Sequence, residues 1–205
     1  MGLRNWAHGP FELLCHAEDH LRSGDDFDRR IALISFDNSI EISVTVYLSL
    51  NPVLRGNKHY KREDVEKWLR NYHTKLDFID EEVMLRQTSW GVSKEDIVWA
   101  HDERNEQYHG GRSGIPEKRV LSVIRDASLW VFGFLFDVTD VEFELELALE
   151  EMRGEAPPAR DTNIDKALDS RYGLVEVAGQ PYYTSELLYN VDPTAYRAAA
   201  GEDGE

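Results

Sequence analysis

Apolar residues recur at helical spacing through most of the first two thirds of the chain. Residues 9–23 carry an apolar stripe and end at a Ser-Gly pair, which predicts an amphipathic helix. Residues 26–50 are apolar on nearly every side, which predicts a long, buried central helix. Residues 62–87 again show one apolar face and predict a third helix.

Two more helices are expected before residue 137. Ser93, with Asp96 three residues later, resembles a capping box and predicts the start of a helix that ends at the glycines after His109. Pro116 suits the first turn of the following helix, whose apolar face extends to Leu135. Four or five helices with short connections predict a helical bundle.

The pattern changes in the last third of the chain. Residues 141–147 alternate between apolar side chains and glutamate, which predicts a half-buried strand. Residues 153–161 contain two adjacent prolines and are interpreted as a linker, and residues 164–168 predict a short polar helix.

The pattern near the end of the chain indicates a hairpin and one more helix. Residues 174–177 and 182–184 are rich in Val and Tyr and are joined by a Gly- and Pro-containing turn, which predicts a β-hairpin. A short helix is expected after Pro193. We therefore predict a mainly α protein, with a bundle over residues 1–136 and a small β-containing extension over residues 137–205.

The charge of the chain is negative and uneven. The 205 residues carry a net charge of −16, and residues 137–205 hold 17 acidic and 5 basic residues, which leaves −4 for residues 1–136. Overall acidity argues against generic duplex DNA binding, where neutralisation of phosphates by Lys and Arg dominates affinity. The acidic extension is expected to pack on the bundle, to widen a dimer interface, or to cover a basic site.

Cysteine content and hydropathy indicate the cellular compartment in which the protein is expected. A single cysteine, Cys15, excludes an intrachain disulfide and a Cys-rich zinc site. The start of the chain lacks a signal-peptide apolar run, and no window approaches 18 apolar residues. These features predict a soluble, cytoplasmic protein without membrane association.

The helix that ends at His109 carries an unusual polar stripe. His101, Asn105 and His109 recur every four residues and share one face. Arg104 and His109 are five residues apart, about 140° around an ideal helix. Their side chains converge only if the last turn loosens before Gly110, or if a second copy of the chain supplies one of them.

Two carboxylates interrupt the long apolar helix. Asp37 and Glu41 lie one turn apart among apolar neighbours, and burying them without partners would be costly. We expect them to meet Arg104, Asn105 or His109, or alternatively to lie on an exposed stripe of the helix.

The segment from Arg104 to His109 resembles the Arg-x4-His motif of the HEPN superfamily, including the Asn that directly follows the Arg. Its position at the end of a capped helix and the acid-containing helix upstream add to this resemblance, which covers roughly residues 8–136. HEPN domains are small helical bundles, and many are metal-independent ribonucleases of toxin–antitoxin and antiviral defence systems, with active sites built across a homodimer.

The resemblance implies a division of roles in RNA cleavage. His109 would be the general base, Arg104 would bind the scissile phosphate, and Asn105 would orient these groups. Asp37, Glu41, His101 and Tyr108 would support them. The implied partners are an RNA substrate, a second copy of the chain, and an antitoxin or regulatory protein, with no cofactor and no metal.

Basic residues near the expected site are candidates for RNA binding. Lys58, Lys61 and Arg62 form the most basic local run, which is alternatively a solvated connection. Arg112, Lys118 and Arg119 follow the motif directly.

Other interpretations remain for the same residues. Arg104 is alternatively bound to Tyr108 or Asp37, and His109 is alternatively a helix C-terminal histidine that interacts with the helix dipole. The competing functional class is a non-catalytic helical module that binds a partner protein or a nucleotide. A metal hydrolase that uses Asp37, Glu41, His16 or His20 lacks a recognisable ligand spacing and ranks last.

Overall fold

The computed structural model describes residues 3–109, 114–153, 159–177 and 179–199. Within these residues the chain forms ten α-helices, two short 3₁₀ helices and one two-stranded antiparallel sheet. The prediction of a mainly α protein with a small β-containing appendage is therefore confirmed. The chain divides into two compact units, Met1–Met152 and Arg153–Glu205, and each is described by itself.

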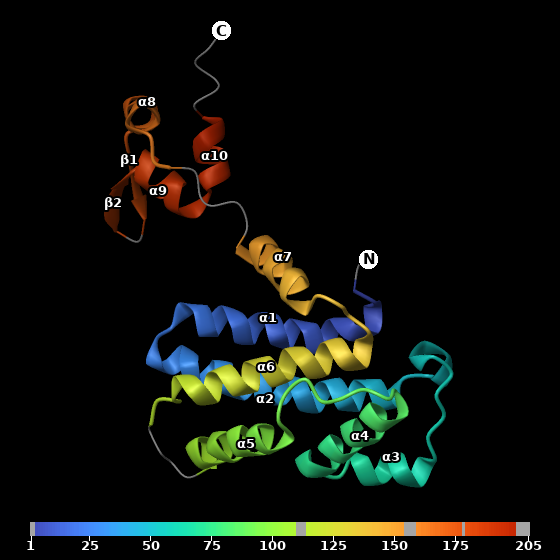
Figure 1. Ribbon diagram of the computed structural model, residues 1–205. Helices are drawn as coiled ribbons and strands as arrows, with labels where there is room; N and C mark the ends of the chain where they lie inside the picture. Colours follow the sequence, from blue (N-terminus) through green and yellow to red (C-terminus); the bar gives the residue numbers. More distant parts are fainter. Residues whose placement is uncertain (1–2, 110–113, 154–158, 178, 200–205) are drawn as a thin grey trace. The chain divides into compact units, whose positions relative to one another are not determined.

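The first unit is a helical bundle around one long helix (Figure 1). Helix α2 lies against α1 and α6, while α4 and α5 lie on its other side. The helices and 3₁₀ turns of this unit are η1 (Asn5–Ala7), α1 (His8–Ser23), α2 (Asp26–Ser49), η2 (Pro52–Arg55), α3 (Arg62–Trp68), α4 (Tyr72–Leu85), α5 (Lys94–His109), α6 (Lys118–Phe136) and α7 (Val141–Arg153).

The apolar pattern of α2 places it at the centre of the core. Ala32, Phe36, Ile40 and Val44 are fully buried along one face. By length and composition α2 could also cross a membrane. In this bundle, however, the same apolar side chains pack against neighbouring helices, as in the core helix of a globular domain.

The predicted helix over residues 62–87 is two helices in the structure. Asn71 adopts an extended backbone conformation and forms a capping box with Thr74, so that α4 starts at Tyr72 and three residues separate it from the end of α3. Ser93 caps α5 as expected, since its Oγ accepts a hydrogen bond from the Asp96 amide at 3.1 Å.

The strand predicted over residues 141–147 is wrong, because this segment begins helix α7. Val141, Leu145 and Leu149 are buried at four-residue spacing, whereas Phe143 and Leu147 are exposed. Asp140 caps the helix by accepting a hydrogen bond from the Phe143 amide at 3.0 Å. Helix α7 belongs to the first unit, so the division of the chain falls after Met152, whereas the sequence placed it after residue 136.

The second unit is small and contains the predicted hairpin. Strands β1 (Leu174–Val177) and β2 (Gln180–Tyr183) pair antiparallel, with Leu174 opposite Tyr183. Helices α8 (Thr162–Tyr172), α9 (Thr184–Val191) and α10 (Pro193–Ala198) complete the unit, and α9 was not predicted. The hydroxyl of the buried Tyr196 lies 2.8 Å from an Asp165 carboxylate oxygen and accepts a hydrogen bond from the Asp161 amide at 3.0 Å.

Candidate functional site

Residues of the predicted site meet where α2 and α5 pack together. Asp37 of α2 contacts His101 of α5, and nearer the start of α2 Arg30 lies with Gln107 at one hollow. The two helices therefore run antiparallel, and α5 ends near the beginning of α2 (Figure 1).

Asp37 is the centre of a buried polar network. Its side chain is fully buried, and its two carboxylate oxygens lie 2.9 and 3.0 Å from Nδ1 of His101. The His101 ring stacks on Tyr72, with ring centroids 3.6 Å apart. Burial raises the pKa of Tyr72 well above its ordinary value, and the negative charge of Asp37 raises it further.

Arg104 is held by the same network. Its Nε lies 3.4 Å from Oδ2 of Asp37, while Nη1 donates to Asn105 Oδ1 at 2.9 Å and Nη2 donates to Asn38 Oδ1 at 3.1 Å. Its side chain is only 17% exposed. The expected meeting of Asp37 with Arg104 is thus present, and the guanidinium has a fixed orientation.

Glu41 is not part of this network. It forms an ion pair with Lys75 of α4 at 3.1 Å, and the Glu41 side chain is 35% exposed. Asp37 and Glu41 therefore differ, because Asp37 faces α5 and Glu41 faces α4. Helical phase alone could not separate these two environments.

The second motif residue lies at the last position of α5. The backbone remains α-helical through His109, so no loosened turn brings this position towards Arg104. The side chains of Tyr108 and His109 lie outside the described residues, as does Arg112.

A small hollow adjoins Arg104. Its volume is 130 Å³, and Arg30, Leu33 and Ile34 of α2 line it together with Arg104 and Gln107 of α5. The side chains of two arginines from different helices thus line one small hollow. The sequence analysis missed Arg30, although the pair Arg29-Arg30 at the start of an apolar helix was a visible signal.

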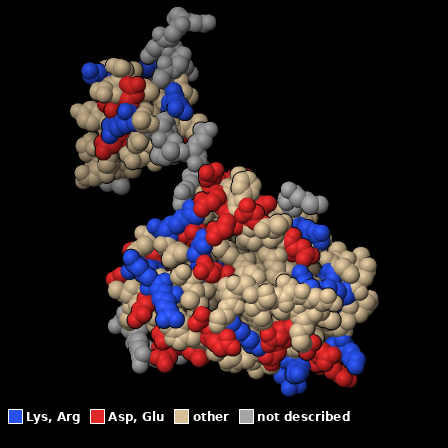
Figure 2. Space-filling model, in the orientation of Figure 1, with Lys and Arg blue, Asp and Glu red and all other residues tan. Residues whose placement is uncertain are grey.

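Further basic residues lie at this end of the bundle. Lys118 and Arg119 are exposed in the first turn of α6, and Arg119 lies over the Trp99 ring at 5.1 Å from its centroid. Arg29 and Lys118 border a second hollow of 320 Å³ between α1, α2 and α6. Figure 2 shows Lys and Arg side chains gathered where α1 ends and α6 begins.

Lys58, Lys61 and Arg62 lie beside α3, away from the end of α5 (Figure 1). Lys58 forms an ion pair with Glu82, which is fully buried and also accepts a hydrogen bond from Tyr60 at 2.6 Å. Burial alone would raise the pKa of Glu82, but the hydrogen bonds from Lys58 and Tyr60 lower it overall. Lys58 therefore has a structural partner, and Arg62 pairs with Glu66 at 2.7 Å.

The histidines of α1 do not form a metal-ligand cluster. His20 Nδ1 lies 2.7 Å from an Asp28 carboxylate oxygen. Across the described part of the chain, no three His, Cys, Asp or Glu side chains are arranged to hold a metal ion.

Comparison with known proteins adds no further assignment. No protein-family model, curated protein or solved structure matches this chain.

Proposed function

We propose that the chain is a metal-independent endoribonuclease of HEPN type, with Arg104 and His109 as its catalytic pair. The observation that carries this proposal is the buried network from α2 that orients Arg104 near the end of α5, five residues before the helix ends. A guanidinium fixed by Asp37 and Asn38 is preorganised to bind a phosphate.

The chemistry needs a base, an acid and a positive charge. A base takes the proton from the ribose 2′-hydroxyl, whose oxygen attacks the adjacent phosphorus, and an acid protonates the departing 5′-oxygen. His109 suits proton transfer because an imidazole titrates near neutral pH, and Arg104 suits stabilisation of the phosphorane-like transition state. The products would bear a 2′,3′-cyclic phosphate and a 5′-hydroxyl.

The helical backbone favours a site shared between two copies. Because α5 remains helical through His109, Arg104 and His109 of one chain diverge by about 140° around the helix axis. Pairing across a twofold axis would bring Arg104 of one chain to His109 of the other. The proposed active form is therefore a homodimer in the cytoplasm.

The basic end of the bundle would bind the RNA backbone. Lys118 and Arg119 extend from the start of α6, and Arg30 borders the same hollow as Arg104. Backbone contacts of this kind contribute affinity without sequence selectivity.

The experiment is cleavage of total tRNA and of an unstructured RNA in EDTA by the wild type, Arg104→Ala and His109→Ala. Two matched controls, Arg70→Ala and His59→Ala, remove the same residue types at exposed positions outside this network. We expect both motif variants to lose activity by about 100-fold or more, as for loss of a general base or a charge-stabilising group. Cleavage by all five proteins at the same rate would refute the assignment.

Mixing the two inactive variants tests the shared site. In a mixed dimer of Arg104→Ala and His109→Ala, one of the two sites receives an intact arginine and an intact histidine from opposite chains. We expect the mixture to recover cleavage that neither variant has alone. A mixture without activity, in which mixed dimers are shown to form, would place both residues in one chain.

The second candidate function is a non-catalytic helical module that binds a partner protein or a nucleotide. The observation in its favour is that the Arg104 side chain is mostly buried and its guanidinium is bound to Asp37, Asn38 and Asn105. This candidate predicts that dimeric wild type does not cleave RNA, and that Arg104→Ala mainly lowers stability.

A further inference from the structure

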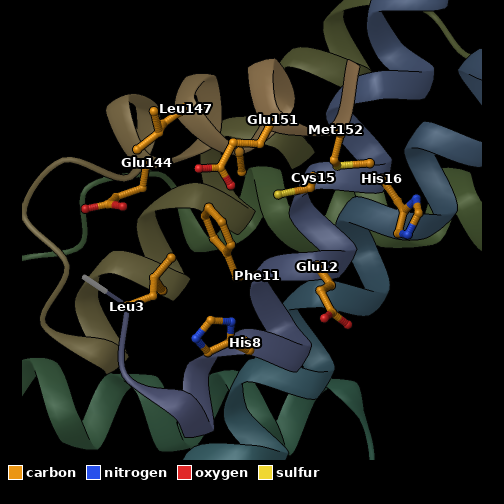
Figure 3. A pocket seen from close by; sticks show the side chains of 11 residues that line it. Leu3, His8, Phe11, Glu12, Cys15, His16, Glu144, Leu147, Glu151 and Met152 are labelled. Atoms are coloured by element: carbon orange, nitrogen blue, oxygen red, sulfur yellow. The ribbon is translucent and has the colours of Figure 1, made fainter. Parts of the chain in front are cut away.

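An apolar hollow lies away from the motif, between α1 and α7 (Figure 3). Its volume is 490 Å³, within the range of small-molecule sites. Its apolar lining comes from Leu3, Phe11, Cys15, Leu147, Ala148 and Met152. An apolar body of small-molecule size would therefore replace water in this space.

Three glutamates and two histidines complete the lining. Glu12 comes from α1, and Glu144 and Glu151 come from α7; His8 and His16 lie on the α1 side. In Figure 3 the Glu151 carboxylate points towards Phe11 and Cys15. The pocket thus combines an apolar interior with carboxylates from two facing helices.

The pocket glutamates differ from their neighbours on the same helices. Glu18 of α1 binds Arg22 and Arg125, and Glu142 and Glu146 of α7 bind Arg125 and Arg22 respectively. Glu12, Glu144 and Glu151 form no ion pair with any residue that the structure describes. Among the described side chains, no ion pair therefore balances their negative charges, and acidic side chains gather over α7 on the face in Figure 2.

The pKa of the Cys15 thiol is shifted by this environment. Burial raises its pKa to about 11, and the charge of Glu12 contributes to the increase. A thiol that resists ionisation is an inert part of the apolar wall, so the pocket is suited to binding rather than to cysteine chemistry.

From this combination we propose that the α1–α7 pocket binds a small hydrophobic cation, an amine or quaternary ammonium with an alkyl or aryl body. The body fills the space beside Phe11 and Cys15, and the cationic group lies near Glu151, whose carboxylate points inward in Figure 3. Glu12 and Glu144 add negative charge at other points of the lining. This site is separate from Arg104 and does not depend on the proposed ribonuclease activity.

The test is calorimetric titration of the full chain with three probes of equal alkyl length, below the concentration at which each self-associates. Octyltrimethylammonium carries a positive charge, octyl sulfate a negative charge, and octyl glucoside none. We expect one site for the cation, weaker binding of the neutral probe, and no binding of the anion. Equal or tighter binding of octyl sulfate would overturn the proposal.

Adjacent residues of α7 give a matched pair of charge variants. Glu151 lines the pocket and Glu150 does not, and both are exposed. Glu151→Gln should weaken binding of the cation by about three- to five-fold, the size of one partly exposed charge interaction, while Glu150→Gln should leave the Kd unchanged. Equal effects of the two variants would show that only the overall charge matters and would refute a defined site.

A variant that fills the pocket tests where the cation binds, without changing the net charge of the protein. Ala148→Phe places a ring in the cavity and should abolish binding of the cation, with an unchanged circular dichroism spectrum as proof of folding. If that variant does not fold, Glu12→Gln combined with Glu151→Gln replaces it, with an expected loss of about ten-fold or more. Unchanged binding in the folded variant, or binding of a Lys-containing amphipathic peptide without binding of the small cation, would overturn the proposal.

Discussion

At the scale of single residues, Asp37 has the largest structural role of the candidate site residues. It is fully buried, and His101, Arg104 and Tyr72 surround it. The sequence left two alternatives open for the carboxylates of the long helix, a buried position beside Arg104, Asn105 or His109 and a place on an exposed stripe, and Asp37 takes the buried position beside Arg104. It could not choose between Asp37 and Glu41, because that choice depends on which helices pack against each face of α2.

Replacing Asp37 should affect stability more than replacing Glu41. Asp37→Ala leaves the cationic Arg104 without its buried carboxylate, and we expect a loss of about 3–5 kcal/mol in the free energy of unfolding. Glu41→Gln disrupts a partly exposed ion pair with Lys75 and should lose about 1 kcal/mol or less. Urea denaturation monitored by circular dichroism measures both. Equal losses would contradict the central role of Asp37.

Glu82 should give the bundle a defined acid sensitivity. Its folded-state pKa is lowered below the ordinary value of 4.5, so its stabilising contribution is complete above about pH 4.5 and is lost as pH falls through the folded pKa. We expect Glu82→Gln to lose about 3 kcal/mol at pH 7, and this difference from the wild type to shrink towards pH 3.

Urea denaturation at several pH values measures this dependence. Glu66→Gln is the control, because Glu66 forms an exposed ion pair with Arg62 and should change stability by about 0.5 kcal/mol or less at every pH. If the difference in the free energy of unfolding between the wild type and Glu82→Gln grew as the pH fell, it would contradict a lowered pKa of Glu82.

At the scale of elements, α7 shows where pattern analysis failed. The alternation of apolar residues with glutamate over residues 141–147 fits a strand, but Val141, Leu145 and Leu149 also fit a helix. Leu149 does not separate the two, because it continues both the alternation and the four-residue spacing. The segment is helical in a unit whose described residues contain no sheet for a strand to join. The apolar spacing of α1 and α2 had no such ambiguity, and both helices were predicted closely.

The start of α2 contains a part of the candidate site that could not be predicted from the sequence. Arg29-Arg30 was readable as a basic pair, but its position beside Arg104 follows from the antiparallel packing of α2 against α5. That packing brings together residues more than seventy positions apart. Local spacing does not determine such contacts.

The turn before α5 should tolerate no side chain at Gly91. A Cβ atom there would overlap the Trp130 ring, which stacks between Trp90 and Phe134. We expect Gly91→Ala to lose about 1–3 kcal/mol, because an overpacked contact forces the ring or the backbone to move.

Gly9 in α1 is the matched control, since its added Cβ would meet nothing within 4 Å. Gly9→Ala should gain about 0.5–1 kcal/mol through improved helix propensity. Thermal denaturation of both variants beside the wild type gives the comparison, and a Gly91→Ala protein as stable as the wild type would disprove the close packing.

At the scale of the whole molecule, the two units differ in the amount of core that they possess. Among the described hydrophobic residues of the second unit, Leu168 and Tyr196 are buried, whereas the core cluster of the first unit extends from Ala7 to Leu149. A domain of about fifty residues has little apolar surface to bury and is only marginally stable.

The units should therefore unfold separately. Scanning calorimetry of the full chain is expected to show a small transition at lower temperature and a larger one for the bundle. A chain shortened to residues 1–152 should retain the larger transition within a few degrees. Loss of the bundle transition after shortening would show that the first unit needs the second in order to fold.

The division of the chain after Met152 also assigns most of its net negative charge to the first unit. Residues 153–205 hold 10 acidic and 5 basic residues, so the first unit carries −11 of the total charge of −16. Seven acidic residues and no basic residue lie in residues 137–152, which include most of α7. The expectation that a separate extension holds most of the acidity is thus corrected, because α7 packs on the bundle itself.

This placement of charge makes the charge distribution of the bundle asymmetric. With acidic side chains over α7 and Lys and Arg near the start of α6, the first unit has an electric dipole moment (Figure 2). A polyanion diffusing towards it is repelled from one face and attracted to another, so its orientation is biased before any contact forms. At physiological ionic strength this bias extends about 8 Å from the surface. Added salt should therefore weaken this orientational bias, although the molecule as a whole remains strongly negative.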